Sequence, residues 1–357
     1  MDIPFELKDA MEKMLEGHSS DELRRISKQM TDRYKNESGR GRVLVSRELE
    51  TQVYAAVRMP ATYGAVCDAL SYTLDCMSGA NASKDEVIID TVMDVGAGSG
   101  AGAWAAHALL QPKHIDCLER EAAMRTTGLH LMDEDESLKT KTTWHAFDLE
   151  KELFGTSGIP EKADWVLASY VLNEMSAEVR ELVIRKLWAA TGSVLTIVEP
   201  GTKEGFAVVK QIREILLAEG AHLLAPCSHE SPCRLDEDDW CHFTCRVMRS
   251  RLHKSLKDAD VPYEDEKYSY ISFAREEGKP ASARILRHPY VTKGAIDLEL
   301  CTAAENTKMT IRKKHPAYKT ARKAKMGDAI DLNAEMPDGL DAPDGLDAPD
   351  RPEMLGV

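Results

Sequence analysis

Apolar residues in the first 75 positions recur at the spacing of three or four residues that is typical of a helix. Met11, Leu15, Ile26 and Met30 form one such series, and residues 53–70 contain a second. No stretch here alternates between apolar and polar residues with a period of two. The pattern predicts an N-terminal helical cap over residues 1–80, which ends in a polar break at residues 78–84.

Strand-like and helix-like patterns alternate over residues 81–222. Short apolar runs predict strands at 91–95, 114–118, 142–147, 165–169 and 194–198, with helices between them. Strands that alternate with helices are typical of a parallel, doubly wound sheet of the Rossmann-like α/β class. We therefore expect the core of the molecule in this segment.

The pattern changes after residue 222. Cys, Pro, Ser, Asp and His dominate residues 225–245, which indicates a loop held by a ligand. Residues 268–274, 283–287 and 295–300 predict further strands, and residues 318–325 a basic helix, so we expect residues 223–330 to complete the core. Residues 331–357 contain an acidic near-repeat rich in Pro and Gly, and such a composition predicts a disordered tail.

Charge is unevenly distributed along the chain. The formal net charge is −14, yet residues 246–326 carry 19 Lys and Arg against 10 Asp and Glu. An acidic protein does not ordinarily bind nucleic acid, but this segment predicts a basic face that is able to contact phosphates.

The beginning of the chain resembles neither a secretory signal nor an Arg-rich transit peptide, and no apolar run reaches the length of a membrane span. Eight cysteines in 357 residues do not indicate a disulfide-stapled secreted domain. We expect a soluble monomer with reduced thiols and no membrane partner. A bacterial cytoplasm is the favoured location, and the mitochondrial matrix is the alternative.

A glycine-rich turn directly follows the first predicted strand, and later strands end in polar residues. Glycines allow a backbone to approach a ligand closely, and the helix that follows presents its positive end. A carboxylate about 20 residues past the glycines is suited to bind ribose hydroxyls. The series predicts a pocket for S-adenosylmethionine and is less typical of dinucleotide binding. The candidate cofactor-binding residues are Asp94, Gly96, Gly98, Gly100, Glu119, Asp148, Asn173 and Glu174.

Four cysteines, Cys227, Cys233, Cys241 and Cys245, lie within 19 residues. Reduced thiols at this density indicate a shared metal, and four thiolates suit either tetrahedral zinc or an iron-sulfur cluster. His229 and His242 are alternative zinc ligands, although we interpret them as ordinary loop residues. Cys301 stands alone after the last predicted strand.

The sequence resembles the methyltransferase-like proteins associated with assembly of the mitochondrial small ribosomal subunit and their bacterial relatives, the group that contains methyltransferase-like protein seventeen. The resemblance covers most of the chain. It rests on the residue blocks 94–100, 169–174, 199–202, 227–233, 239–243 with 246–247 and 249–250, and 263–270.

The resemblance implies a class I methyltransferase fold that binds S-adenosylmethionine, carries a [4Fe-4S] cluster on four cysteines and docks on small-subunit rRNA and ribosomal proteins. By position it implies Cys227, Cys233, Cys241 and Cys301 as the ligands, whereas sequence proximity favours Cys245 over Cys301. We choose Cys301, because a ligand from a distant strand ties the C-terminal segment to the core.

The basic residues then become candidates for RNA phosphate contact. They are Arg246, Arg249, Arg251, His253, Lys254 and Lys257, which fall at helical spacings, and the second run at 312–325. The expected function is that of an assembly and translation factor of the small subunit. The alternatives are an active rRNA methyltransferase and a zinc-stapled methyltransferase for a small molecule or a protein. Asn173-Glu174 replaces the Asn/Asp-Pro-Pro-Tyr/Phe motif of enzymes that methylate the amino groups of bases, so we assign no catalytic residue.

Overall fold

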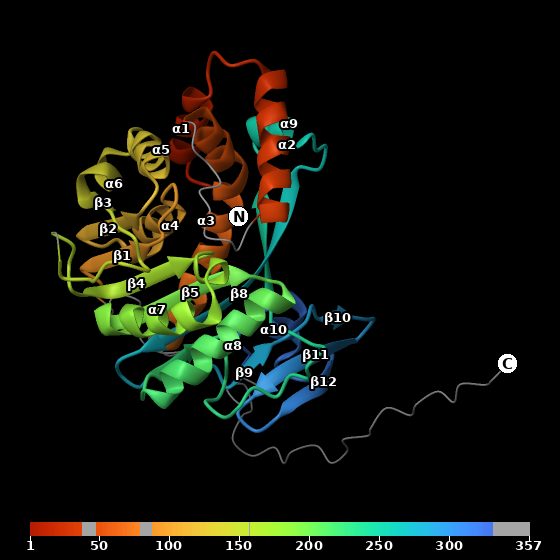
Figure 1. The fold of residues 1–357 in the computed structure, drawn as a ribbon. Helices are drawn as coiled ribbons and strands as arrows, with labels where there is room; N and C mark the ends of the chain where they lie inside the picture. The colour runs from red at the N-terminus through yellow and green to blue at the C-terminus, as the bar shows by residue number, and fades with distance from the viewer. Residues whose placement is uncertain (38–47, 79–87, 157, 331–357) are drawn as a thin grey trace.

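The structure, a computed structural model, describes residues 1–37, 48–78, 88–156 and 158–330 (Figure 1). Residues 79–84 of the predicted polar break and the predicted tail at 331–357 lie outside the described residues. The helices are α1 Phe5–Met14, α2 Ser20–Glu37, α3 Glu48–Ser78, α4 Ala101–Leu110, α5 Ala122–Met132, α6 Glu136–Lys141, α7 Ala177–Ala190, α8 Lys203–Ala218, α9 Arg251–Lys257 and α10 Tyr318–Lys323, with a short 3-10 helix η2 at Leu172–Glu174.

The main sheet has the strand order β3-β2-β1-β4-β5-β8-β6, and β7 also pairs with β8. Its strands are β1 Thr91–Val95, β2 His114–Glu119, β3 Thr142–Ala146, β4 Ala163–Ser169, β5 Thr191–Pro200, β6 His222–Ala225, β7 Phe243–Met248 and β8 Tyr263–Ala274. The pairs among β1 to β5 are parallel, whereas β8 runs antiparallel to β5, β6 and β7. A parallel sheet with one antiparallel strand inserted beside β5 is the topology of the class I methyltransferase fold.

Helices cover both faces of this sheet. Successive side chains of a strand point to opposite faces, so Val92 of β1 packs in the cluster of α3 and α4. Met93 and Val95 pack in the cluster of α7 and α8 instead. Figure 1 shows α7 and α8 in front of the sheet and the long helix α3 running behind it. The predicted helical cap therefore forms one layer of the core.

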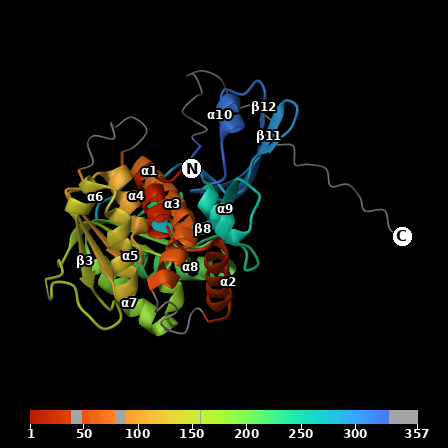
Figure 2. The same cartoon turned by 90° about the horizontal axis from the view of Figure 1, so that it is seen from above.

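A second, smaller sheet stands beside the main body (Figure 2). It has the order β10-β11-β12, and β9 also pairs with β11. The strands are β9 Ala283–Ile285, β10 Tyr290–Val291, β11 Ala295–Thr302 and β12 Asn306–Arg312. One face packs with α10 in a separate apolar cluster that includes Ile296, Leu298 and Ile311. Residues 283–330 thus form a small unit with a core of its own.

Several predicted elements differ from the observed ones. The five strands predicted in the core are confirmed as β1 to β5 within three residues at their ends. The predicted ligand-held loop is too long, because β7 begins at Phe243. Arg246, which we expected on a helix, lies on this strand, where buried Phe243, Cys245 and Val247 alternate with more exposed neighbours. None of the described helices is long and apolar enough to cross a membrane.

Candidate cofactor and metal sites

The loop between β1 and α4 forms the floor of a cavity of about 200 Å³ at the carboxyl end of the sheet. Gly96 has a φ of +70°, and a Cβ at this position would lie 2.7 Å from Val171 Cγ2. Gly98 has a φ of +56°, and its Cβ would meet no atom within 4 Å. Glycine is therefore required at residue 96 by both conformation and space, and the loop leaves open room above residue 98.

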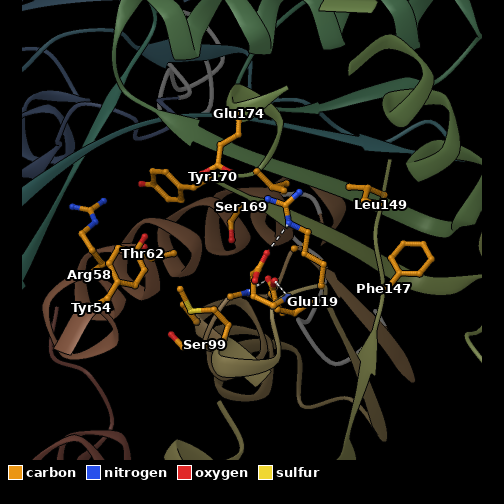
Figure 3. A pocket seen from close by; sticks show the side chains of 18 of the residues that line it. Tyr54, Arg58, Thr62, Ser99, Glu119, Phe147, Leu149, Ser169, Tyr170 and Glu174 are labelled. Atoms are coloured by element: carbon orange, nitrogen blue, oxygen red, sulfur yellow. Dashed lines mark hydrogen bonds and ion pairs between the residues drawn. The ribbon is translucent and has the colours of Figure 1, made fainter. Parts of the chain in front are cut away.

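Acidic side chains from successive strand ends surround this cavity (Figure 3). Glu119 is the last residue of β2, Asp148 follows β3, and Glu174 lies in η2 after β4. Glu119 accepts hydrogen bonds from the Gly98 N–H at 2.9 Å and the Glu121 N–H at 2.7 Å. Burial raises the pKa of both Glu119 and Glu174. The structure thus brings Gly96, Gly98, Glu119, Asp148 and Glu174 together around one cavity.

Three other candidate cofactor residues do not line this cavity. Asp94 is fully buried beneath the loop, where its Oδ2 accepts the Ala103 N–H of α4 at 2.9 Å. Gly100 is the N-cap of α4, and a Cβ there would meet Trp144 and Met132. Asn173 lines a neighbouring cavity. Asp94 and Gly100 therefore support the glycine loop from the core side and do not face the cavity.

Two fully buried carboxyl groups support the loops around the cavity. Glu199, at the end of β5, accepts the Leu172 N–H of η2 at 3.0 Å. Burial raises the pKa of Glu199 to about 8 and the pKa of Asp94 to about 7. The polar end of β5 thus holds the segment after β4 in place and does not reach the cavity itself.

Helix α3 also lines the cavity, although the sequence analysis did not assign this helix to the site. Tyr54, Arg58 and Thr62 face the cavity from this helix (Figure 3). Arg58 Nη2 and the Tyr170 hydroxyl both donate to Glu266 Oε1, each at 3.1 Å. A signal for this role is present in the sequence, because Arg58 is the single arginine in the mostly apolar stretch 53–66.

A second cavity of about 360 Å³ adjoins the first between α2, α3 and η2. The two share five lining residues, which are Tyr54, Arg58, Thr62, Tyr170 and Glu174. Asn173 lines only the second cavity, and its Oδ1 is buried without a hydrogen-bond partner among the described residues. The arrangement can therefore accommodate two ligands side by side.

A separate pocket lies between the main sheet and the small sheet, and four cysteines line it. Cys227, Cys233 and Cys241 come from the β6–β7 connection, and Cys301 comes from β11. The Ser228 hydroxyl donates to the Cys301 carbonyl at 3.1 Å, which holds the connection against the strand. These are the four cysteines that the resemblance implied as ligands.

Cys245 lies elsewhere. It is buried on β7 against α3, where a Cβ on Gly64 would come within 2.8 Å of its Sγ. It belongs to the same apolar cluster as Leu70 of α3. Of the two loop histidines, His229 lines the cysteine pocket, whereas His242 stacks on Trp240 with ring centroids 5.2 Å apart.

The four thiols surround one pocket but are not arranged to bind a single metal ion. Within residues 1–37, 48–78, 88–156 and 158–330, no group of three or more His, Cys, Asp or Glu side chains is positioned to hold a metal ion. Burial and the neighbouring thiols raise the pKa of Cys241 well above its usual range, and burial raises the pKa of Cys227 to about 11. Without a bound cation these groups therefore remain neutral thiols.

The first basic segment is largely engaged within the protein. Arg246 pairs with Asp265 at 2.7 Å, and Arg249 and Lys257 both pair with Glu264, at 3.2 and 2.5 Å. Arg246 and Arg249 also precede α9, so the predicted helical series is wrong for them. Because these cations are already paired within the protein, they are poor candidates for phosphate contacts. Arg251 and Lys254 stay as the candidates of the first segment.

The second basic segment is free of such pairs in the part of the chain that the structure describes. Its exposed cations lie at the end of β12, on the β12–α10 turn, on α10 and just after it: Arg312, Lys313, Lys314, Lys319, Arg322, Lys323 and Lys325. Exposed cations without acidic partners attract phosphate groups. This surface of the small unit is the better candidate for contact with RNA.

Comparison with known sequences finds one family. Residues 48–331 match the family model described as the mitochondrial small ribosomal subunit Rsm22. The human ribosome assembly protein METTL17, mitochondrial, is 25% identical over 276 residues, which cover 68% of this chain and 55% of the human protein. Rsm22-cox11 tandem protein 2 of Schizosaccharomyces pombe, also mitochondrial, is 22% identical, and the match covers 69% of this chain and 39% of that protein. The chain thus matches about half of the human protein's length and less of the yeast protein's.

Solved structures resemble the chain only loosely. The magnesium protoporphyrin IX methyltransferase of Synechocystis with bound S-adenosylmethionine is 15% identical, with a TM-score of 0.37, and the match covers 69% of this chain and 91% of that one.

Proposed function

Because the chain belongs to the Rsm22 family, we propose that it is a methyltransferase-like factor that acts on the small ribosomal subunit and binds S-adenosylmethionine and a [4Fe-4S] cluster. The family match spans residues 48–331, which include both sheets and both sites. The observation that carries the proposal is the convergence of Cys227, Cys233, Cys241 and Cys301 on one pocket from two separate elements.

The glycine-loop cavity is the proposed S-adenosylmethionine site. Gly96 and Gly98 let the backbone approach the cofactor, and Glu119 is placed to accept hydrogen bonds from its ribose hydroxyls. Asp148 and Glu174 complete the acidic rim. When bound, this cofactor supplies an activated methyl group. The space above Gly98, where a Cβ would meet no atom, supports the fit.

The donor chemistry of the cysteine pocket fits a metal cluster. Four thiols without a carboxylate or a second histidine are soft ligands, which favour iron-sulfur clusters or zinc over Mg²⁺ or Ca²⁺. Burial raises the pKa of Cys227 and Cys301, and a bound metal supplies the positive charge that stabilises thiolates. With four protein ligands, the cluster has a structural role and ties the small unit to the core.

The proposed partners are small-subunit rRNA and ribosomal proteins, and the exposed cations of the β12–α10 surface are the proposed phosphate contacts. The human and yeast relatives are named as mitochondrial, and this supports the mitochondrial matrix over the bacterial cytoplasm that we favoured from the sequence. The monomeric state stays a prediction.

An active rRNA methyltransferase is the second candidate function. The cavity beside the cofactor site favours it, because it offers room for an acceptor group next to Glu174 and Asn173. Incorporation of radioactive methyl groups from S-adenosylmethionine into bound small-subunit rRNA distinguishes the two functions: the assembly factor binds rRNA with little or no incorporation.

The proposed cluster is tested on protein purified without oxygen, by analysis of iron, sulfide and zinc together with the absorption spectrum. We expect a brown protein with about four irons per chain. Cys301→Ser should bleach it, and the matched control Cys245→Ser should leave the iron content unchanged, because Cys245 lies outside the pocket. A colourless wild-type protein with one zinc per chain contradicts the cluster and favours the zinc-stapled alternative.

A further inference from the structure

Two arginine side chains are buried at the cysteine pocket. Arg213 of α8 is 5% exposed, Arg284 of β9 is 2% exposed, and both line the pocket. Removing a guanidinium from water is costly unless an anion compensates its charge. The surroundings of these two side chains must therefore supply negative charge.

Arg213 has no carboxylate partner among the residues that the structure describes. Its Nη2 donates to the backbone carbonyls of His229 at 2.9 Å and Ser231 at 2.5 Å. Its Nε is buried and has no acceptor within the described part of the chain. Carbonyl groups orient this side chain on the β6–β7 connection, but they leave its charge uncompensated.

Arg284 is in the same situation. Its Nε and Nη1 donate to the carbonyls of Pro226 and Gly327, both at 2.9 Å. Its Nη2 lies 3.5 Å from the Cys76 thiol, and no carboxylate in the described ranges pairs with it.

The thiols are the groups that can supply the missing charge. No Asp or Glu among the described residues lines the pocket. Tyr270 lines it too, but burial raises the pKa of this phenol well above its usual range. The Arg213 guanidinium hydrogen-bonds to the Cys227 thiol. Two buried cations and four ligand thiols thus occupy one pocket.

We infer that Arg213 is the counter-charge of the cluster, with Arg284 as its companion. A four-iron core of charge about +2 on four thiolates carries a net charge of about −2, which two guanidiniums neutralise. This inference rests on the proposed function, because it presupposes the cluster. A cation beside a cluster favours the form with one more electron, so Arg213 raises the midpoint potential.

The test is an anaerobic redox titration of the full chain, followed by EPR and visible absorption. Arg213→Gln should weaken the cluster's affinity for the electron about tenfold, which makes the midpoint potential about 59 mV more negative. Arg213→Lys keeps the charge and should stay close to wild type. Lys210→Gln is the matched control: this exposed cation lines the same pocket one turn earlier on α8, and solvent screens its charge.

The outcomes separate the two proposals. A wild-type protein without iron contradicts the proposed cluster and the inference with it. An iron-loaded Arg213→Gln whose potential equals that of Lys210→Gln overturns the counter-charge role alone, since an arginine that only anchors the loop would not change the potential. Should Arg213→Gln fail to fold, Arg284→Gln replaces it, because Arg284 is the second buried cation that lines the pocket. An iron-loaded Arg284→Gln whose midpoint potential equals that of Lys210→Gln then overturns the inference as well.

Discussion

Glu199 shows how a single buried carboxyl group supports the cofactor cavity without facing it. Its carboxyl group accepts the Leu172 N–H at Oε1 and also the Asn173 N–H, but it makes no ion pair among the described residues. An uncompensated carboxylate at such a position is costly, so the protonated form is favoured in the folded protein. The segment after β4 therefore depends on a group whose charge changes near neutral pH.

We predict that the stability of the protein falls as pH rises from about 5 to about 8. Burial raises the pKa of Glu199 from 4.5 to about 8. The folded state therefore binds more protons than the unfolded state in this window, and the free energy of unfolding decreases with pH by at most about 1.4 kcal/mol per unit for this group. Urea denaturation at several pH values measures the slope.

Glu199→Gln should flatten this dependence, because the amide stays neutral at every pH and can still accept the Leu172 N–H. Asp94, whose pKa burial raises to about 7, should account for the slope that is left. Glu214→Gln, an exposed change on α8, is the control and should keep the full slope. An unchanged slope in Glu199→Gln would mean that this group is ionised in the folded protein.

At the scale of elements, α9 is attached to β8 through one carboxylate. Glu264 of β8 accepts from Lys257 Nζ at 2.5 and 2.6 Å and from Arg249 Nη2 at 3.2 Å. The side chain of Glu264 is 13% exposed, and that of Arg249 is 14% exposed. Pairs this well shielded contribute more than surface pairs, chiefly because loss of one partner leaves the others buried and unpaired.

We predict that Glu264→Gln lowers the free energy of unfolding by about 2–3 kcal/mol. The adjacent pair of Asp265 and Arg246 offers a matched control, since its side chains are 38% and 56% exposed. Asp265→Asn should cost less than about 1 kcal/mol. Equal effects of the two changes in urea denaturation would show that Glu264 acts as an ordinary surface partner.

The sequence predicts elements well where a single pattern is strong. The strands β1 to β5 were found because they are short apolar runs with helices between them. The strand β7 was missed because Arg246 and Arg249 suggested a helical series, although Phe243, Cys245 and Val247 already alternate. The short edge strand β10 has only two exposed residues, Tyr290 and Val291, and carries no such signal.

Some residues of the candidate sites could be predicted from the sequence and others could not. Residues adjacent to a strand end, such as Glu119, were predictable because the carboxyl ends of parallel strands meet at one edge. Arg58 was not, because the packing of α3 over that edge is a tertiary contact. The resemblance placed Cys301 with the clustered cysteines where spacing alone favoured Cys245.

At the scale of the whole molecule, charge is segregated. The net charge of the chain is −14, while the β12–α10 surface carries exposed cations without acidic partners among the described residues. Phosphate contacts release counterions, so their number determines how steeply RNA binding weakens with salt. The first basic segment contributes less, because its cations are already paired with β8.

We predict that replacing Lys313, Lys314 and Lys323 together by Ala weakens binding of small-subunit rRNA and reduces the slope of log affinity against log salt by about 2. Filter binding or fluorescence anisotropy over a salt series measures the slope. The matched control replaces three exposed cations that are already ion-paired elsewhere in the molecule, Lys113, Lys139 and Arg185, and should leave the slope almost unchanged. Equal slopes for the two triple variants would place the RNA contact on another surface.

The position of β8 in the main sheet affects the order in which the protein can fold during synthesis. In this sheet Val194 pairs with Ala274 and Pro200 pairs with Tyr268. This edge of β5 therefore has no partner strand until about 70 further residues have been synthesised. At 5–20 residues per second, this edge stays open on the nascent chain for roughly 4–14 s. An unpaired strand edge is prone to aggregation. We therefore expect the growing chain to need a chaperone during this interval, and a fragment that stops before β8 to be insoluble.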